Sequence, residues 1–92
     1  MMDMYLIDRT VPGAATLDDE HLAALAARSN QVLADLGPGI QWVHSYVVGD
    51  RIVCVYDADD EALIREHADC GGFPIDTVTS VSRMFDPTTA VA

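Results

Sequence analysis

The chain has 92 residues, of which 15 are acidic and 5 are basic, and its formal net charge is −10. Half of its residues are apolar, which is typical of a globular protein and not of a disordered chain. This length supports one hydrophobic core, so we expect a single domain at residues 1–87 and a short flexible tail at residues 88–92. Because the acidic charge repels phosphate groups and anionic lipids, we expect neither nucleic acid nor a membrane as a partner.

The sequence also carries signals about the cellular compartment. No apolar run is long enough to span a membrane, and the first residues lack the basic start and long apolar stretch of a signal peptide. We therefore expect a cytoplasmic protein. Cys54 and Cys70 do not form a C-x-x-C pair, and cytosolic proteins rarely use structural disulfides, so both are predicted to be free thiols.

The first half of the chain predicts a strand followed by a long helix. Residues 4–10 are rich in large apolar side chains and are followed by a proline-glycine turn. Thr16 is a candidate helix cap, with Asp19 three residues later in an arrangement like a capping box. The sequence Gly37–Gly39 ends this helix. Its apolar stripe recurs at three- and four-residue spacing and consists of Leu22, Leu25, Ala26, Ser29, Val32, Leu33 and Leu36.

The second half begins with two predicted strands, at residues 40–48 and 51–57, joined by a hairpin turn at Gly49-Asp50. Because side chains alternate along a strand, we expect Trp42, His44 and Tyr46 on one side of the first of these strands. The second strand is centred on Cys54, which is predicted to be a small core residue.

A shorter helix and a final strand complete the chain. Asp57 or Asp59 is a candidate cap for the helix, and Gly71-Gly72 ends it. The last strand is predicted at residues 77–85. The narrow apolar face of the helix consists of Leu63, Ile64, His67 and Ala68.

This order of elements predicts the fold class. Strand, helix, two strands, helix and strand form an α+β fold, the ferredoxin-like βαββαβ sandwich, in which a four-stranded antiparallel sheet carries two helices on one face. The other face of the sheet is then uncovered. Because a monomer rarely exposes a large apolar patch, we expect a homodimer that covers this face.

The histidines are the main candidates for chemistry, since imidazole is a common ligand for nickel, zinc and copper and a common general base. His44 lies between Trp42 and Tyr46 in sequence alternation. His67 and Cys70 are three residues apart on a predicted helix, which places them at neighbouring positions of one face. His21 follows a possible second ligand, Asp18, by three residues.

Each candidate metal ligand also has a purely structural explanation. His21 is explained by a solvated helix surface, His44 by a buried hydrogen bond, and the pair His67 and Cys70 by helix packing. Strong catalytic signatures such as a phosphate-binding glycine loop are absent from the sequence. This absence favours a protein that is not an enzyme, but it leaves the question open because an open sheet face can assemble a site from scattered residues.

Four short runs carry a resemblance to a known family: Tyr5-Leu6-Ile7-Asp8-Arg9-Thr10, Trp42-Val43-His44-Ser45-Tyr46-Val47, Cys54-Val55-Tyr56-Asp57-Ala58 and Gly72-Phe73-Pro74-Ile75-Asp76. In their order and spacing they are similar to the small bacterial nickel-binding ferredoxin-like proteins, formerly described only as a domain of unknown function. The resemblance extends from the first strand through Asp86-Pro87, and it implies a homodimer of ferredoxin-like subunits that binds nickel at its surface without a known reaction. His44 is the histidine inside a matching run.

Three hypotheses follow. The first is a dimeric protein without catalytic activity that sequesters or buffers nickel, with His44 as a ligand, His67, Cys70 and His21 as further candidates, and carboxylates completing the shell. The second is a small-molecule-binding protein or small enzyme that uses a cleft near His44, with His44 as base and Tyr46 as donor. The third is an interaction module whose open sheet face binds a different protein.

Overall fold

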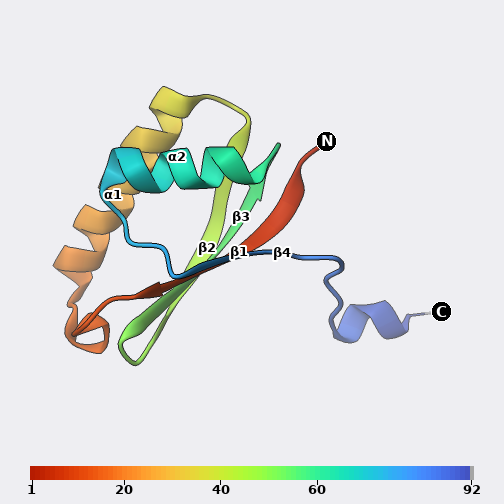
Figure 1. Ribbon diagram of the computed structural model, residues 1–92. Coiled ribbons are helices and arrows are strands. Elements are labelled where there is room, and N and C mark those ends of the chain that lie inside the picture. The colour runs from red at the N-terminus through yellow and green to blue at the C-terminus, as the bar shows by residue number, and fades with distance from the viewer. Residues whose placement is uncertain (92) are drawn as a thin grey trace.

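The computed structural model describes residues 1–91, and it contains one antiparallel sheet with strand order β2-β3-β1-β4. Both helices lie on one face of this sheet (Figure 1), which confirms the predicted ferredoxin-like α+β fold. Within residues 1–91, neither helix is long and apolar enough to cross a membrane. The elements are β1 (Asp3–Thr10), the single-turn helix η1 (Ala14–Thr16), α1 (Asp19–Leu36), β2 (Ile40–Val48), β3 (Arg51–Ala58), α2 (Glu61–Gly71), β4 (Thr77–Ser80) and the single-turn helix η2 (Pro87–Ala90).

Helix α1 begins at a different cap from the predicted one. Asp18 is the N-cap, and its carboxylate accepts a hydrogen bond of 2.9 Å from the backbone N–H of His21. Thr16 belongs to η1 instead, where its hydroxyl donates to the carbonyl of Gly13 over 2.7 Å. The prediction that Thr16 caps α1 is therefore wrong, because Thr16 lies in the single-turn helix η1 and α1 starts only at Asp19.

Helix α2 shows the same kind of shift. Its N-cap is Asp60, whose carboxylate accepts from the backbone N–H of Leu63 over 3.0 Å. Neither of the predicted caps, Asp57 and Asp59, fills this position, since β3 extends through Ala58 and moves the start of α2 further along the chain. The predicted end is confirmed, because Gly72 follows α2 in the left-handed conformation with a φ of 72°.

A β-bulge in β2 changes the predicted faces of that strand. Trp42 pairs with Tyr56 of β3, but His44 pairs with Val55, so Val43 is an extra residue without a partner. The bulge reverses the alternation, and Trp42 lies on the helix-bearing side of the sheet while His44 lies on the open side. The prediction that Trp42 shares a side with His44 and Tyr46 is therefore wrong.

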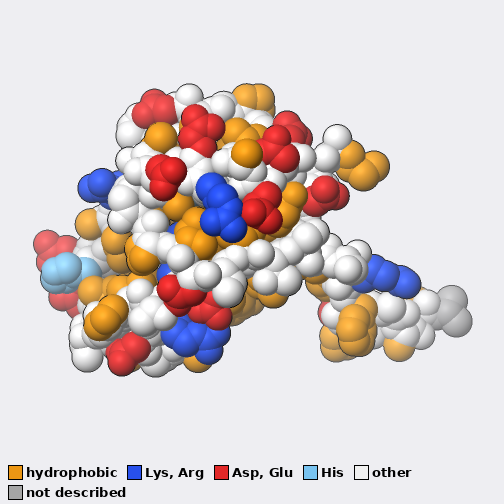
Figure 2. All heavy atoms as spheres, viewed as in Figure 1, with side chains coloured by type: hydrophobic (Ala, Val, Ile, Leu, Met, Phe, Trp, Pro, Cys, Tyr) orange, Lys and Arg blue, Asp and Glu red, His pale blue; other side chains and the backbone are white. Residues whose placement is uncertain are grey.

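Strand β4 is shorter than predicted, covering Thr77–Ser80 instead of residues 77–85. It pairs only with β1, from Asp8 opposite Thr77 to Tyr5 opposite Ser80. The backbone N–H of Val81 still donates to the carbonyl of Met4 over 2.8 Å, but because β1 begins at Asp3, the predicted strand has no neighbour beyond residue 82. The chain after β4 extends away from the domain and carries η2 at its end (Figures 1 and 2).

The hydrophobic core lies between the sheet and the two helices. Ile7 of β1 and Ile64 of α2 are almost fully buried. Cys54 is also buried, as predicted. The buried cluster consists of Tyr5, Ile7, Ile40, Cys54, Tyr56, Ala58 and Ile64.

Neighbouring residues of β1 provide a test of the two sheet faces. Ile7 is 0% exposed on the core side, whereas Leu6 is 39% exposed on the open side. We expect Ile7→Ala to lower the free energy of unfolding by about 2–5 kcal/mol, because it leaves a cavity in the core. The matched control Leu6→Ala is expected to cost less than about 1 kcal/mol.

The measurement is urea denaturation followed by circular dichroism, at the lowest practical protein concentration so that self-association contributes little. Equal losses for the two variants would contradict the assignment of the faces.

Candidate functional site

His44 is an exposed histidine on the open face of the sheet. Its ring meets that of Tyr46 edge to face, with the ring centroids 5.0 Å apart and the planes at 66°. Across the strand pair, His44 lies opposite Val55, which in turn lies opposite Leu6 of β1. The imidazole is therefore exposed to solvent beside apolar side chains of the neighbouring strands. The alternative of a buried, hydrogen-bonded His44 is not observed.

His67 and Cys70 do not share an environment, although three residues separate them on α2. His67 is only 1% exposed and packs between aromatic rings, with ring-centroid distances of 5.3 Å to Tyr56 and 5.2 Å to Phe73. Its Nε2 lies 3.1 Å from the hydroxyl of Ser29 on α1. Cys70, in contrast, is exposed. The buried histidine and the exposed thiol therefore do not converge on one surface point in this structure.

The burial of His67 controls its protonation. Burial lowers the pKa of His67 below its ordinary value of 6.5, and the positive charge of Arg9 lowers it further, while the hydrogen bond to Ser29 opposes both effects. The folded protein therefore holds this imidazole in its neutral form at neutral pH.

His21 is exposed and interacts with the cap of its own helix. Its Nδ1 lies 2.6 Å from the Asp18 carboxylate, which also accepts from the His21 backbone. These hydrogen bonds, led by the one from the backbone N–H, lower the pKa of Asp18. The expected pair is thus formed, but as a helix-capping arrangement at an exposed end.

Among residues 1–91, no three His, Cys, Asp or Glu side chains are close enough to hold one metal ion. His44, His67, Cys70 and His21 lie on the open sheet face, in the core and at two exposed helix positions. Both cysteines are free thiols, as predicted. A single copy of the chain therefore does not assemble the predicted metal ligands into one site.

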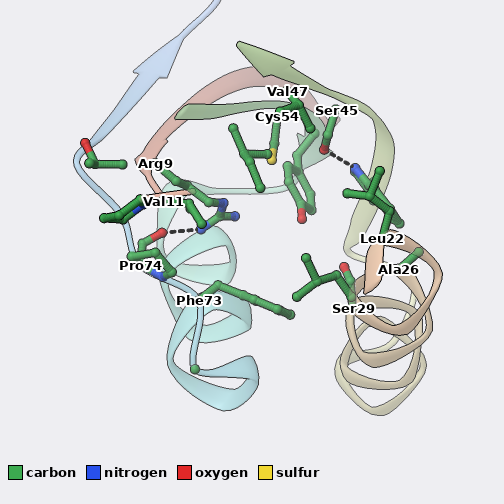
Figure 3. Close-up of a pocket in the computed structure, with 17 residues that line it drawn as sticks. Arg9, Val11, Leu22, Ala26, Ser29, Ser45, Val47, Cys54, Phe73 and Pro74 are labelled. Carbon is green, nitrogen blue, oxygen red and sulfur yellow. Dashed lines mark hydrogen bonds between the residues drawn. The ribbon is translucent and has the colours of Figure 1, made fainter. Parts of the chain in front are cut away.

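The structure contains a cavity of about 540 Å³ between the sheet and the helices (Figure 3). The cleft predicted near His44 is not this cavity, because its lining includes neither His44 nor Tyr46, both of which the bulge places on the opposite face. The lining comes from β1, the turn after it, α1, β2, β3 and the loop after α2: Arg9, Thr10, Val11, Pro12, Leu22, Leu25, Ala26, Ser29, Trp42, Ser45, Val47, Ile52, Cys54, Tyr56, Gly72, Phe73 and Pro74.

Arg9 is the residue of this cavity that sequence reasoning missed. It is 4% exposed, and its Nη1 donates to the backbone carbonyl of Pro74 over 2.6 Å. Its guanidinium carbon lies 5.8 Å from the centre of the Phe73 ring. The available signal was the alternation of β1, since Arg9 continues the series of Tyr5 and Ile7 on the core side.

The cavity wall contains further polar groups. The Trp42 indole N–H donates to the Ser45 hydroxyl over 2.9 Å, a contact that exists because the bulge turns both side chains to the same side. Burial raises the pKa of Tyr56, while a hydrogen bond with the Ser29 side chain and the charge and hydrogen bonding of Arg9 oppose that rise. Tyr56 is therefore a protonated hydroxyl at neutral pH.

Comparison with known proteins adds the following findings. A family model described as "Nickel responsive protein SCO4226-like" matches residues 5–81. The crystal structure of SCO4226 from Streptomyces coelicolor A3(2) is similar, with a TM-score of 0.75 and 10% sequence identity, covering 89% of this chain and 99% of that chain. No match was found among the curated proteins. At this identity, the structural match supports the fold alone.

The lowered pKa of His67 predicts a pH dependence of stability. Below about pH 6.5 the unfolded chain binds a proton at this histidine more readily than the folded chain does, so protonation favours unfolding. We expect the stability that neutral His67 provides to be complete above about pH 6.5 and to be lost as the pH falls through the lower folded-state pKa.

The measurement is thermal unfolding between about pH 7.5 and about pH 5. His67→Gln, which retains a polar group near Ser29, is expected to weaken the decrease in Tm, whereas the exposed control His44→Gln is expected to leave it unchanged. If the decrease in Tm of His67→Gln with falling pH equals that of the wild type, groups other than His67 cause the decrease.

Proposed function

Because this chain belongs to the SCO4226-like family of nickel responsive proteins, we propose that it is a dimeric protein that sequesters or buffers nickel without catalysing a reaction. The observation that carries the proposal is the exposed imidazole of His44 on an uncovered sheet face. Imidazole nitrogen is a suitable ligand for nickel. In this proposal His44 is the principal protein ligand.

Nickel requires more ligands than one copy of the chain provides. Among the described residues, no three candidate side chains converge in a single copy. A homodimer with two-fold symmetry brings the same surface of two copies together, so that a residue near the axis meets its equivalent. We therefore infer that His44 of one subunit and His44 of the partner subunit bind the same ion, with carboxylates or water completing the shell.

The apolar character of the open face supports self-association through it. Leu6, Tyr46 and Val48 are 39%, 57% and 50% exposed, although all three are large apolar side chains on this face. Val43 at the bulge is also exposed, at 47%. A second copy that packs against this patch would remove the apolar surface from water and would bring the histidines together.

The other candidate ligands hold different places in the proposal. His21 and Cys70 are exposed and stay candidates for weaker surface sites. His67 would have to leave the core and its contact with Ser29 to reach an ion. We further propose a cytoplasmic location, which suits the two free thiols.

Nickel titration tests the role of His44. In isothermal titration of the tag-free protein, we expect saturable binding of nickel that His44→Ala weakens by roughly tenfold or more, since it removes a proposed ligand. His21→Ala is the matched control, because it removes an exposed histidine outside the proposed site, and it is expected to retain the wild-type affinity. Unchanged binding in His44→Ala would contradict the proposed ligand.

Dimer formation is tested separately from metal binding. We expect Tyr46→Asp to shift the protein toward the monomer in analytical ultracentrifugation without nickel, because it places a charge in the proposed interface. Asn30→Asp adds the same charge at an exposed position of α1 and is expected to leave the dimer intact. If Tyr46→Asp and Asn30→Asp sediment alike, the open face is not the interface.

A further inference from the structure

We propose that the cavity between the sheet and the helices binds a small monocarboxylate with an apolar body, and that Arg9 holds the carboxylate. The proposal goes beyond nickel binding and concerns the opposite side of the sheet. It rests on the position of Arg9 in the wall of a cavity of about 540 Å³ (Figure 3).

Arg9 carries a buried positive charge without an ion-pair partner among residues 1–91. A guanidinium is always protonated in proteins, and a buried charge is costly unless it is paired. Arg9 is 4% exposed, yet among residues 1–91 no carboxylate lies within ion-pair distance of it. Its Nη1 donates to the carbonyl of Pro74, and its side chain also acts as a hydrogen-bond partner of the Tyr56 hydroxyl. A guanidinium has five N–H donors, more than these two neutral partners use, and a carboxylate matches the geometry of the remaining ones.

Neutral hydroxyl groups of Ser29 and Tyr56 line the same cavity as Arg9. The Nδ1 atom of His67 is buried without a hydrogen-bond partner, while Nε2 contacts the Ser29 hydroxyl. Because unpartnered buried donors are rarer than unpartnered acceptors, we assign the proton to Nε2, which donates to Ser29. The Ser29 hydroxyl then keeps its own proton, which the neighbouring Tyr56 hydroxyl or a ligand can accept. Ser29 and Tyr56 both line the cavity and thus add two hydroxyl donors to the guanidinium.

Apart from these polar groups, the cavity is lined mainly by apolar side chains. The volume of the cavity falls within the range of small-molecule sites, about 300–1,000 Å³. Aromatic and aliphatic side chains form most of the wall, and they include Trp42, Phe73, Leu22 and Ile52. A few polar donors at one place in an otherwise apolar cavity favour a ligand with one polar end and an apolar body.

The acidic charge of the protein limits how many negative charges the ligand can carry. The chain carries a net charge of −10, and acidic side chains spread over the surface of the helices (Figure 2). This field opposes the approach of any anion, and it opposes a phosphate ester or dicarboxylate more than a singly charged group. Salt screens the surface charges over about 10 Å, whereas the buried Arg9 acts at contact distance. A single carboxylate is therefore favoured over a multiply charged anion.

The experiment compares decanoate, below its micellar concentration, with decan-1-ol, which has the same chain length and no charge. Trp42 is the one tryptophan of the chain and lines the cavity, so its fluorescence reports binding directly, alongside titration calorimetry. EDTA is present throughout, which separates the result from nickel binding. We expect saturable one-to-one binding of decanoate, with decan-1-ol at least about tenfold weaker.

Variants connect this preference to Arg9. Arg9→Met removes the charge and keeps an apolar stem, so it should bind decanoate and decan-1-ol with similar affinity, while the exposed control Arg65→Met keeps the wild-type preference. If Arg9→Met does not fold by circular dichroism, Ala26→Phe replaces it as a cavity-filling variant and should weaken both probes by about tenfold or more. The proposal is overturned if the wild type does not distinguish the two probes, if it binds neither, if folded Arg9→Met keeps the preference, or if Ala26→Phe binds as the wild type does.

Discussion

The extra residue in β2 is the constraint on which both proposed sites depend. Val43 has no partner on β3, and the strand alternation reverses around it. Trp42, on one side of the bulge, joins the wall of the cavity, while His44, on the other side, joins the open face. Without the bulge, these two residues would point in the same direction. The protein can therefore present a histidine outward from the same strand that presents a tryptophan inward.

The core on the helix side contains three buried polar side chains, those of Arg9, Ser29 and His67. Arg9 and His67 are both buried, at 4% and 1% exposure. The charge of Arg9 helps to lower the pKa of His67, so the histidine stays neutral beside it. Buried polar groups that are only partly satisfied destabilise a fold, and a ligand for Arg9 would supply a physical reason for them to be there.

The open face and the cavity face offer two independent chemistries. The open face presents imidazole and apolar surface, which suits a shared metal ion between two copies of the chain. The cavity presents a guanidinium and hydroxyls within an apolar wall, which suits an organic anion. Membership of the nickel responsive family bears on the first of these sites, whereas the second depends on the cavity and on the contacts of Arg9 in its wall.

Local sequence patterns determined the elements and their order. Apolar periodicity located both helices, the Gly49-Asp50 turn located the hairpin, and together they predicted the ferredoxin-like topology that the structure has. The exact caps were less predictable, because several neighbouring aspartates can each cap a helix and the length of the preceding turn or strand decides among them.

Only the tertiary structure decided which residues could form a site. A bulge leaves no clear mark in a sequence of alternating β-branched and aromatic residues, so the separation of His44 from Trp42 required the pairing with β3. Likewise, the i, i+3 spacing of His67 and Cys70 described neighbours on a helix, but the packing of α2 against α1 buried one and exposed the other. The sequence by itself determined what kinds of ligands the chain carries. The tertiary structure decided where they point, because that direction depends on register and packing between segments far apart in the chain.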